Sequence, residues 1–351
     1  MQNNKKQSNK NIEVLIDHNH KFFNEDKLKK WEISQGDDYL NYRKIWNDYP
    51  KKGFVDTVPI HLDIEASSAC NMKCVMCPRT DMLLDGTFWK VENFNYAQYI
   101  KLIDETTKDG KLKSIKFQYL GEPLVNKNLI KMIKYAKSRG VVDVMFNTNA
   151  ALLTEKKSVE VINSGVDKVF FSFDSPYREK YNKIRIGGDY DQVLENIKGF
   201  MRIRNNLKKT TPLTRVQMVL MKDNEDEWDE FKKLFEPIVD TVAFGWWMDY
   251  NLNNNKKDFL IKNSSKKDKD KGVFCCPQIW QRMFVHPDGV VTPCCFDAKR
   301  ELKMGNINET SVEEVWNGKK YSELRSLHAS GKFYENDICR NCALANFRPN
   351  K

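Results

Sequence analysis

The chain has 351 residues, of which 40% are hydrophobic and 30% are charged, and its formal net charge is +10 at pH 7. This length provides material for one large and one smaller domain with a hydrophobic core. The Lys and Arg residues are spread along the chain rather than clustered with aromatic residues, so the charge indicates a solvated surface. Nucleic acid is therefore not an expected partner, while an anionic substrate stays open.

No stretch reaches the roughly 18 to 20 apolar residues that span a bilayer, and the first residues, MQNNKKQSNKN, contain no apolar signal core. We therefore expect a cytoplasmic protein with no membrane partner. Nine cysteines in such a chain favour metal ligation over a disulfide framework, because cytosolic thiols are kept reduced.

In chain order, the sequence predicts four segments. They are a helical lead-in over 1–55, an α/β domain over 56–250, a Lys/Asn-rich linker over 251–271 and a small cysteine-rich domain over 272–351. In the α/β domain, strand-like runs alternate with amphipathic helical stretches. The predicted strands lie near 58–65, 113–119, 141–147, 167–173, 214–221 and 240–248. This alternation predicts a mainly parallel sheet, a partial barrel, with its active site at the carboxyl ends of the strands.

Directly after the first predicted strand, Cys70, Cys74 and Cys77 form a C-x3-C-x2-C triplet. Three thiolates at this spacing can converge on one inorganic cluster from a single loop. Three cysteines on a four-iron cluster leave one iron open to a small molecule, whereas a structural zinc site would be closed by a fourth ligand. The triplet therefore indicates chemistry, and the alternatives are half of a zinc site or buried thiols.

The triplet resembles the signature loop of the radical S-adenosylmethionine (SAM) enzymes, and the segments that follow it match that family in order. YLGEPL after the second predicted strand is similar to the family's GGEP segment, although Leu120 replaces the first glycine. The resemblance implies a partial (βα)6 barrel with a SAM-binding [4Fe-4S] cluster on Cys70, Cys74 and Cys77. It also implies reductive cleavage of S-adenosyl-L-methionine to a 5′-deoxyadenosyl radical.

Further polar residues match the family's SAM contacts by position. They are Gly121 and Glu122 for the amino group, Asn149, Ser172 and Asp174 for the ribose and carboxylate, and Arg185 as a carboxylate clamp. The alternative for the Asn, Ser and Asp residues is ordinary helix capping. Met76 stands where the family often carries an aromatic residue against the adenine, and its thioether can still pack there.

Six more cysteines lie near the end of the chain. Cys276, Cys294, Cys339 and Cys342 supply four well-spaced thiolates, enough to close a metal site, while Cys275 and Cys295 are spare. Cysteine count alone does not separate zinc from iron-sulfur, and a one-residue slip would exchange each spare cysteine with its neighbour. The arrangement resembles the SPASM extension in its single-cluster form, the twitch domain, which implies one auxiliary [4Fe-4S] cluster.

The resemblance implies an oxidoreductase, and the expected reaction is a two-electron oxidation of a small carbohydrate, cyclitol or polyol, with the auxiliary cluster as electron acceptor. Flavodoxin or ferredoxin is the expected electron donor. If a thiol returned hydrogen instead, the reaction would be an epimerisation, with Cys275 or Cys295 as the donor. A peptide substrate is a further alternative, for which residues 1–55 would form a docking element, and an iron-sulfur scaffold is the non-enzymatic one.

The last predicted strand ends in VAFGWWMDY, where Trp247 and Asp249 are candidate substrate residues. An aromatic ring beside an acid suits a sugar, which presents an apolar face and hydroxyl edges. Strand alternation places Trp246 and Trp247 on opposite faces, so only one of them can point into the barrel.

Overall fold

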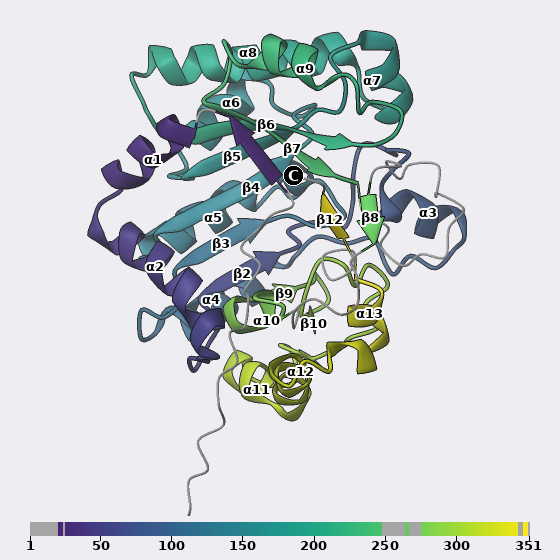
Figure 1. The fold of residues 1–351 in the computed structure, drawn as a ribbon. Helices are drawn as coiled ribbons and strands as arrows, with labels where there is room; N and C mark the ends of the chain where they lie inside the picture. The colour runs from purple at the N-terminus through teal and green to yellow at the C-terminus, as the bar shows by residue number, and fades with distance from the viewer. Residues whose placement is uncertain (1–19, 24, 248–263, 267–274, 343–346, 350–351) are drawn as a thin grey trace, which may run out of the picture.

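The computed structural model describes residues 20–23, 25–247, 264–266, 275–342 and 347–349 (Figure 1). Its core is a ten-stranded sheet in the order β1-β7-β6-β5-β4-β3-β2-β9-β10-β11, and β12 pairs with β8 in a second sheet. The strands are β1 (His20–Phe23), β2 (His61–Ile64), β3 (Ser114–Phe117), β4 (Asp143–Thr148), β5 (Lys168–Ser172), β6 (Leu213–Leu220), β7 (Thr241–Trp246), β8 (Ser264–Lys266), β9 (Arg282–Val285), β10 (Val290–Thr292), β11 (Gly305–Asn306) and β12 (Phe347–Pro349). Strands β2 to β7 pair in parallel, and β9 extends this set beside β2.

Helices precede, connect and follow the parallel strands. They are α1 (Glu25–Ser34), α2 (Asp37–Lys52), α3 (Pro78–Leu84), α4 (Tyr96–Thr107), α5 (Leu129–Ser138), α6 (Glu155–Ile162), α7 (Arg178–Ile184), α8 (Tyr190–Asn206), α9 (Trp228–Phe235), α10 (Gln278–Gln281), α11 (Val312–Asn317), α12 (Lys319–Ala329) and α13 (Asp337–Arg340). Figure 1 shows α10 to α13 gathered beside β9 and β10, with α1 and α2 along another side of the sheet. The carboxyl-terminal cysteine segments therefore lie next to the first barrel strand.

The predicted α/β fold class with a partial barrel is confirmed, and all six predicted strands are present as β2 to β7. The lead-in is helical over α1 and α2, as predicted, and the structure adds the short strand β1, which the sequence did not indicate. Pairing with β7 stabilises β1, and its own sequence lacks the alternation of apolar and polar residues that would predict a strand. The predicted linker lies outside the described residues apart from β8. The domain boundaries stay predictions.

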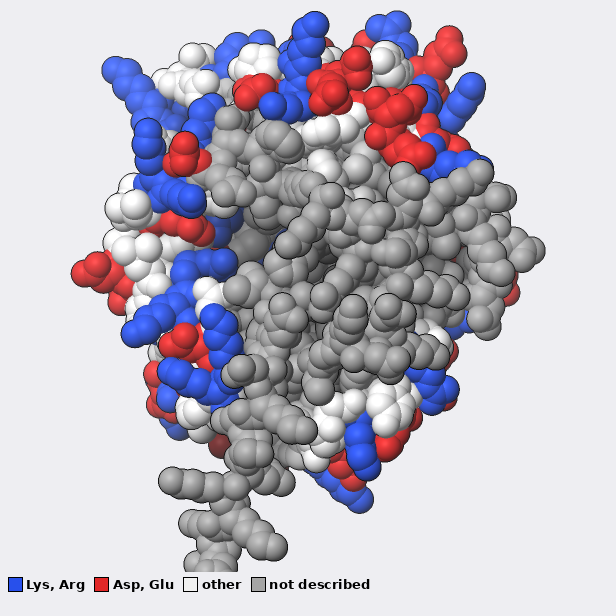
Figure 2. Space-filling view, in the orientation of Figure 1, with Lys and Arg blue, Asp and Glu red and all other residues white. Residues whose placement is uncertain are grey.

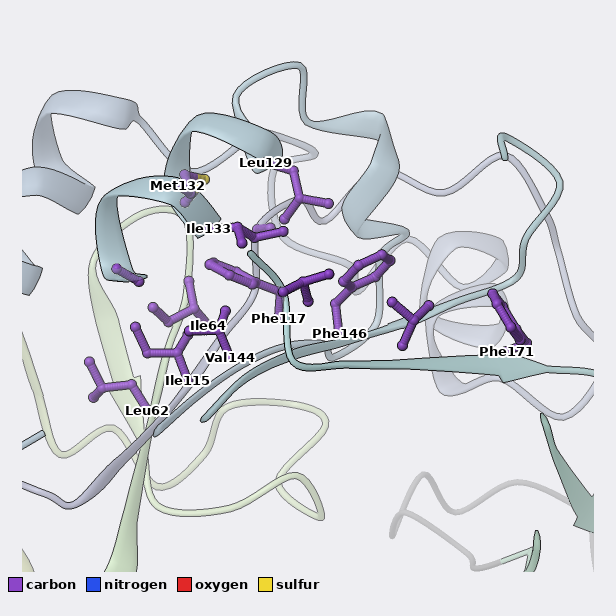
Figure 3. Packing of buried hydrophobic residues seen from close by; sticks show 14 of the residues in the cluster. Leu62, Ile64, Ile115, Phe117, Leu129, Met132, Ile133, Val144, Phe146 and Phe171 are labelled. Carbon is purple, nitrogen blue, oxygen red and sulfur yellow. The ribbon is translucent and has the colours of Figure 1, made fainter. Parts of the chain in front are cut away.

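The main hydrophobic core lies between the sheet and the helices that cover it (Figure 3). Alternate residues of neighbouring strands, such as Ile64, Phe117 and Phe146, point to this side and are fully buried. They meet Met132 and Ile133 of α5, whose apolar residues recur at helical spacing. Burial of each such side chain stabilises the fold by roughly 1.5 to 3 kcal/mol.

The other side of the barrel sheet, which we call the inner face, is polar. Seven of its charged and amide residues are Asp63, Lys116, Gln118, Asn147, Arg215, Gln217 and Arg282. Strand register places them together: Asp63 pairs with Lys116, and Phe170 lies between Asn147 and Arg215. Asn147 donates a hydrogen bond to Gln118 Oε1 (3.1 Å), and Gln118 donates to Asp63. Asp63 is buried and the other six are half-buried.

Helix α2 closes the amino-terminal end of the barrel. Tyr39 and Tyr42 are each 1% exposed. The Tyr39 hydroxyl accepts from Lys168 Nζ (2.7 Å) at the start of β5, and Ser114 Oγ at the start of β3 donates to the Tyr42 hydroxyl (2.9 Å). Lys168 also forms a buried ion pair with Asp143 (2.8 Å). The amino-terminal helices are therefore part of the barrel's internal packing.

The charged surface is mixed in sign. Figure 2 shows Lys and Arg intermingled with Asp and Glu where the described elements face the viewer, which agrees with the solvated surface inferred from the sequence. Among the described helices, none combines the length and the apolar character needed to cross a membrane.

Candidate active site

The three-cysteine loop, residues 65–77, connects β2 to α3 at the carboxyl end of the sheet. Cys70, Cys74 and Cys77 are all half-buried in it. The pKa of the Cys74 thiol is raised to about 12, mainly by burial, which Arg185 opposes and the nearby Cys77 and Cys70 thiols reinforce. Three mutually close thiols with partial access suit a shared positively charged group, which would stabilise their ionised forms.

The backbone of this loop is held by the segment that ends α7. Lys73 N–H donates to the Ile186 carbonyl (2.8 Å), and Val75 N–H donates to the Ile184 carbonyl (3.0 Å). These two hydrogen bonds resemble a short strand pairing, and they place Arg185 directly against the cysteines.

The GEP turn packs on the same loop from the end of β3. A Cβ atom at Gly121 would lie 1.8 Å from the Ser67 carbonyl oxygen, so only glycine allows this approach. Glu122 N–H donates to the Ala69 carbonyl (2.8 Å). Tyr119, two residues before Gly121, has φ of 139°, a strained value for a residue with a side chain. Strain of this kind is often found where a backbone is shaped around a ligand.

The Glu122 carboxylate is held by contacts within the protein, and its role at the SAM amino group stays a prediction. Glu122 is 3% exposed. Its Oε1 accepts from Leu124 N–H (3.1 Å) and Thr148 Oγ1 (2.8 Å), and its Oε2 accepts from Asn149 N–H (2.8 Å). The carboxylate thus ties the GEP turn to the end of β4, and the turn's backbone is a second candidate contact for the SAM amino group.

Asn149 follows β4 and contacts the three-cysteine loop. Its Nδ2 donates to Asn71 Oδ1 (2.9 Å) and lies 3.8 Å from Cys70 Sγ. The next residue, Ala150, has φ of 60°, a second left-handed residue at a strand end. Ser172, the last residue of β5, is half-buried on the inner face.

Asp174 and Arg185 form a buried pair beside the three-cysteine loop. Asp174 Oδ1 accepts from Val219 N–H (2.8 Å), and Oδ2 pairs with Arg185 Nη2 (2.7 Å). Arg185 is 5% exposed, its Nε has no hydrogen-bond partner among the described residues, and its charge lowers the pKa of the buried Cys74 thiol. Asp174 therefore orients Arg185, and Arg185 is the member of the pair suited to bind an anion.

Trp247 lies beneath the three-cysteine loop. Its indole N–H donates to the Met76 carbonyl (3.2 Å), and the two residues form a buried cluster with Ile184 and Met221. The Trp246 ring instead lies 5.2 Å from Phe244, so the two tryptophans point in different directions as expected. Trp247 as a substrate residue stays a prediction, and Asp249 lies outside the described residues.

The carboxyl-terminal cysteines converge on a cavity of their own. Cys276, Cys294, Cys339 and Cys342 all line it, together with apolar residues such as Ile279. These are the four thiols that the sequence assigned to one site, brought together from the start of α10, the end of the β9-β10 hairpin and α13. A closed set of four thiols in an apolar shell fits an auxiliary cluster.

His328 on α12 is a residue of this cavity that the sequence did not indicate. Its Nδ1 accepts from Cys276 N–H (3.2 Å), and its Nε2 lies 3.4 Å from Cys339 Sγ. Burial lowers the pKa of His328 to about 4, so the imidazole is neutral. It is a single histidine eleven residues before Cys339, and no local motif marks it.

The two spare cysteines differ in surroundings. Cys295 is near the inner face. The pKa of its thiol is raised to about 11, mainly by burial, while Arg282 lowers this pKa and Asp63 raises it. Cys275 is buried, and apart from burial only Cys276 influences its pKa. Among the described residues, no three His, Cys, Asp or Glu side chains are close enough to hold a single metal ion. The assignment of each cysteine to a cluster is therefore a proposal.

Two family models match the chain. Residues 64–235 match the Radical SAM superfamily, and residues 275–343 match SPASM, an iron-sulfur cluster-binding domain. The first match includes the three-cysteine loop and the GEP turn, and the second includes all six carboxyl-terminal cysteines. Together they cover most of the chain.

Known proteins with different activities are similar to this chain. A tungsten-containing aldehyde ferredoxin oxidoreductase cofactor-modifying protein of Pyrococcus furiosus is 24% identical over 330 residues, which cover 81% of this chain and 87% of the relative. The S-adenosyl-L-methionine-dependent 2-deoxy-scyllo-inosamine dehydrogenase of Niallia circulans is 22% identical over 286 residues, which cover 80% of this chain and 91% of the relative.

Among solved structures, SuiB of Streptococcus suis bound to S-adenosylmethionine matches with a TM-score of 0.59 at 15% identity. The match covers 92% of this chain and 82% of SuiB, and it concerns the fold. The two family models confirm the family that the sequence motifs indicated. The chain belongs to the radical SAM superfamily and carries a carboxyl-terminal SPASM iron-sulfur cluster-binding domain.

Proposed function

We propose that this radical SAM enzyme oxidises a secondary alcohol of a small carbohydrate, cyclitol or polyol by two electrons. The observation that carries the proposal is the cavity lined by Cys276, Cys294, Cys339 and Cys342. A cluster bound by four cysteines has no open iron for a substrate, so its suitable role is electron acceptance.

The residues at the carboxyl end of the sheet are proposed to hold the SAM-binding [4Fe-4S] cluster and SAM. Cys70, Cys74 and Cys77 are the cluster ligands, and Arg185 binds the SAM carboxylate while Asp174 orients it. The backbone of Gly121 faces the amino group, and Asn149 and Ser172 flank the ribose. When bound, the cluster and SAM together supply a 5′-deoxyadenosyl radical, and the chain's own residues position the substrate and exclude water.

The inner face supports a small polyol as the substrate. It offers amide and charged side chains, such as Gln118, Asn147 and Gln217, in a half-buried position. Side chains of this kind donate to and accept from hydroxyl groups. The Niallia circulans relative, a dehydrogenase of 2-deoxy-scyllo-inosamine, supports the same class of substrate.

A peptide substrate has less support. SuiB has also been solved bound to the precursor peptide SuiA. However, α1 and α2 were the candidate docking element here, and α2 uses Tyr39 and Tyr42 to close the barrel. These buried residues cannot also bind a peptide without opening the barrel.

Epimerisation of a similar substrate is the second candidate, because Cys295 lies near Asp63 and Arg282 of the inner face. In that reaction the radical would remove a hydrogen atom from carbon, and the Cys295 S–H would return one from the opposite side. The inner-face position favours Cys295 over Cys275 as the donor.

The two reactions are distinguished with polyols and aminocyclitols deuterated at each carbinol carbon, incubated anaerobically with reduced enzyme and SAM. Oxidation transfers deuterium to 5′-deoxyadenosine and yields a carbonyl product, and Cys295→Ala leaves it intact. Epimerisation yields an isomer of the substrate that has gained hydrogen from solvent, and Cys295→Ala abolishes it. Deuterium transfer only from a peptide would contradict the proposed substrate class.

A further inference from the structure

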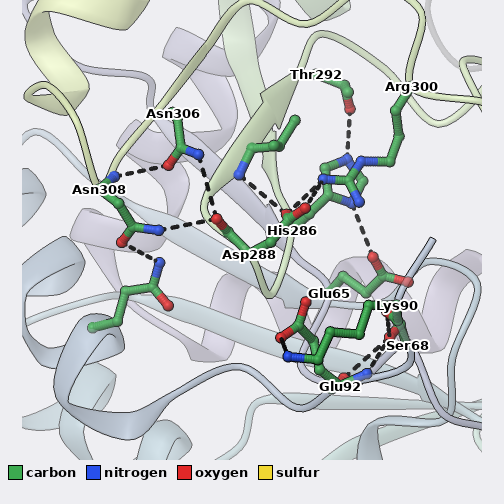
Figure 4. A network of polar contacts seen from close by, with 12 residues as sticks. Glu65, Ser68, Lys90, Glu92, His286, Asp288, Thr292, Arg300, Asn306 and Asn308 are labelled. Atoms are coloured by element: carbon green, nitrogen blue, oxygen red, sulfur yellow. Dashed lines mark hydrogen bonds and ion pairs between the residues drawn. The ribbon is translucent and has the colours of Figure 1, made fainter.

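A buried hydrogen-bonded chain joins the barrel to the SPASM domain. It begins at Glu65, directly after β2. The Glu65 backbone N–H donates to the Val285 carbonyl of β9 (3.0 Å). Glu65 Oε2 lies 2.9 Å from His286 Nδ1, and His286 Nε2 lies 3.0 Å from Thr292 Oγ1 (Figure 4). Glu65 is 2% exposed, and His286 and Thr292 are each 0% exposed.

The hydrogen-bonded chain of Glu65, His286 and Thr292 is incomplete at its barrel end. Glu65 Oε1 is buried and has no hydrogen-bond partner among the described residues, although the Leu120 amide faces the carboxyl. A buried polar atom without a partner is costly to the fold, by about 1 to 3 kcal/mol. Its position directly after the barrel's first strand, in line with Asp63 of the inner face, indicates a role for this oxygen.

The surroundings favour a single shared proton. Burial raises the pKa of Glu65 to about 8, Arg300 and Arg79 lower it, and Asp288 raises it. Burial and the nearby Arg300 lower the pKa of His286, so the imidazole is neutral. The rings of Tyr119 and Trp89, 5.0 Å and 6.1 Å from the His286 ring, exclude water from the pair.

The hydrogen-bonded chain also connects the two cysteine sets. Glu65 belongs to the loop that carries Cys70, and Thr292 is two residues before Cys294. Tyr119 bridges the same gap, because its hydroxyl donates to the Asp297 carbonyl (2.9 Å) beyond Cys294. The pair therefore lies between the place where a substrate would react and the place where its electron would go.

We propose that Glu65 and His286 form the proton-accepting site of the oxidation. This inference rests on the proposed function. The substrate's carbinol hydrogen atom leaves to the SAM-derived 5′-deoxyadenosyl radical. The remaining carbon radical then loses its hydroxyl proton to the pair and one electron to the SPASM cluster, and the C–O bond becomes a carbonyl.

Proton and electron movements are coupled in this arrangement. An electron on the SPASM cluster adds negative charge near the pair, and a proton taken up there offsets it. A carboxylate whose pKa lies near the working pH combines basicity with a usable population of the ionised form. Glu65 meets that condition because of its burial.

The test is an EPR-monitored redox titration of the reconstituted full-length protein from pH 6 to pH 10. It follows the iron-sulfur signal that SAM does not perturb, which belongs to a fully cysteine-ligated cluster. The midpoint potential should be constant below about pH 8, where the pair holds its proton in both redox states. Above that it should fall by up to about 59 mV for each tenfold drop in proton concentration.

Glu65→Gln should abolish this slope, because the amide cannot take up the proton. Asp288→Asn should retain the slope but move its onset to lower pH, since Asp288 lies outside the hydrogen-bonded chain and its charge raises the pKa of Glu65. A pH-independent wild-type potential with the cluster intact, or a slope that survives in Glu65→Gln, overturns the inference and leaves the proposed function standing. Absence of a reducible second cluster would overturn both. A flat wild-type profile overturns the inference even if the variant does not fold.

Discussion

Replacement of Glu65 by glutamine should change how the protein's stability depends on pH. Burial raises the pKa of this carboxyl from 4.5 to about 8. The folded state therefore holds the proton to a higher pH than the unfolded chain does. The resulting stabilisation is fully present below pH 4.5, and it is lost as the pH rises through 8.

The size of the effect follows from that shift. Each pKa unit corresponds to about 1.36 kcal/mol, so the unfolding free energy of the wild type should fall by about 4 kcal/mol relative to Glu65→Gln between pH 4.5 and pH 8. All other ionisable groups are common to both proteins, so their contributions largely cancel in the difference.

Urea unfolding of cofactor-free, reduced protein, followed by circular dichroism at pH 5 and pH 9, measures this difference. Glu309→Gln, at an exposed position, is the control and should keep the wild-type profile. The same pH dependence in wild type and Glu65→Gln would mean that Glu65 is already ionised at neutral pH in the folded protein. That result would refute the reasoning from burial.

Three further substitutions test the candidate active site. Gly121→Ala should lower bound iron, because its Cβ would lie 1.8 Å from the Ser67 oxygen, whereas Gly199→Ala, with no contact closer than 3.8 Å, should bind iron normally. Arg185→Ala should weaken SAM binding by about 1.5 to 3 kcal/mol, or roughly ten- to a hundredfold in equilibrium dialysis, with iron content unchanged. Unaltered affinity would remove Arg185 from the SAM site. Trp247→Phe removes the indole N–H that donates to the Met76 carbonyl, and Met76 stands where the family packs a residue against the adenine. Loss of this one hydrogen bond, worth about 1 kcal/mol, should raise the SAM Kd about fivefold. An effect on substrate coupling alone would assign Trp247 to the substrate instead.

Local spacing was sufficient to predict most of the barrel and both cysteine sets. The six parallel strands follow from alternating hydrophobic runs, and the C-x3-C-x2-C triplet forms one loop by its spacing alone. Cys276, Cys294, Cys339 and Cys342 line one cavity as predicted, because a hairpin and a short helix are local structures with sequence signals.

Features that depend on distant pairing were missed. Strand β9 joins the parallel sheet beside β2, across more than half of the chain, and no periodicity encodes that register. The pairing creates the contact between Glu65 and His286, so neither residue was singled out from the sequence. His328 was missed for the same reason, since it reaches the cysteine cavity only through the packing of α12.

The role of Glu122 shows a different limit. A motif identifies the residue, but the motif does not say which of its atoms meets the ligand. In the structure, Thr148, Asn149 and Leu124 donate three hydrogen bonds to the carboxylate, which can accept about four. The turn's backbone therefore becomes a candidate contact beside the carboxylate, and the motif alone does not supply that information.

The most direct test of the account combines iron analysis with SAM cleavage in anaerobically reconstituted, reduced protein. We expect about eight irons per chain, because each cysteine set would hold a four-iron cluster, and formation of methionine and 5′-deoxyadenosine. Replacing Cys70, Cys74 and Cys77 together by alanine should halve the iron and abolish cleavage. Failure of the wild type to form 5′-deoxyadenosine, or continued cleavage by the triple variant, would contradict the account.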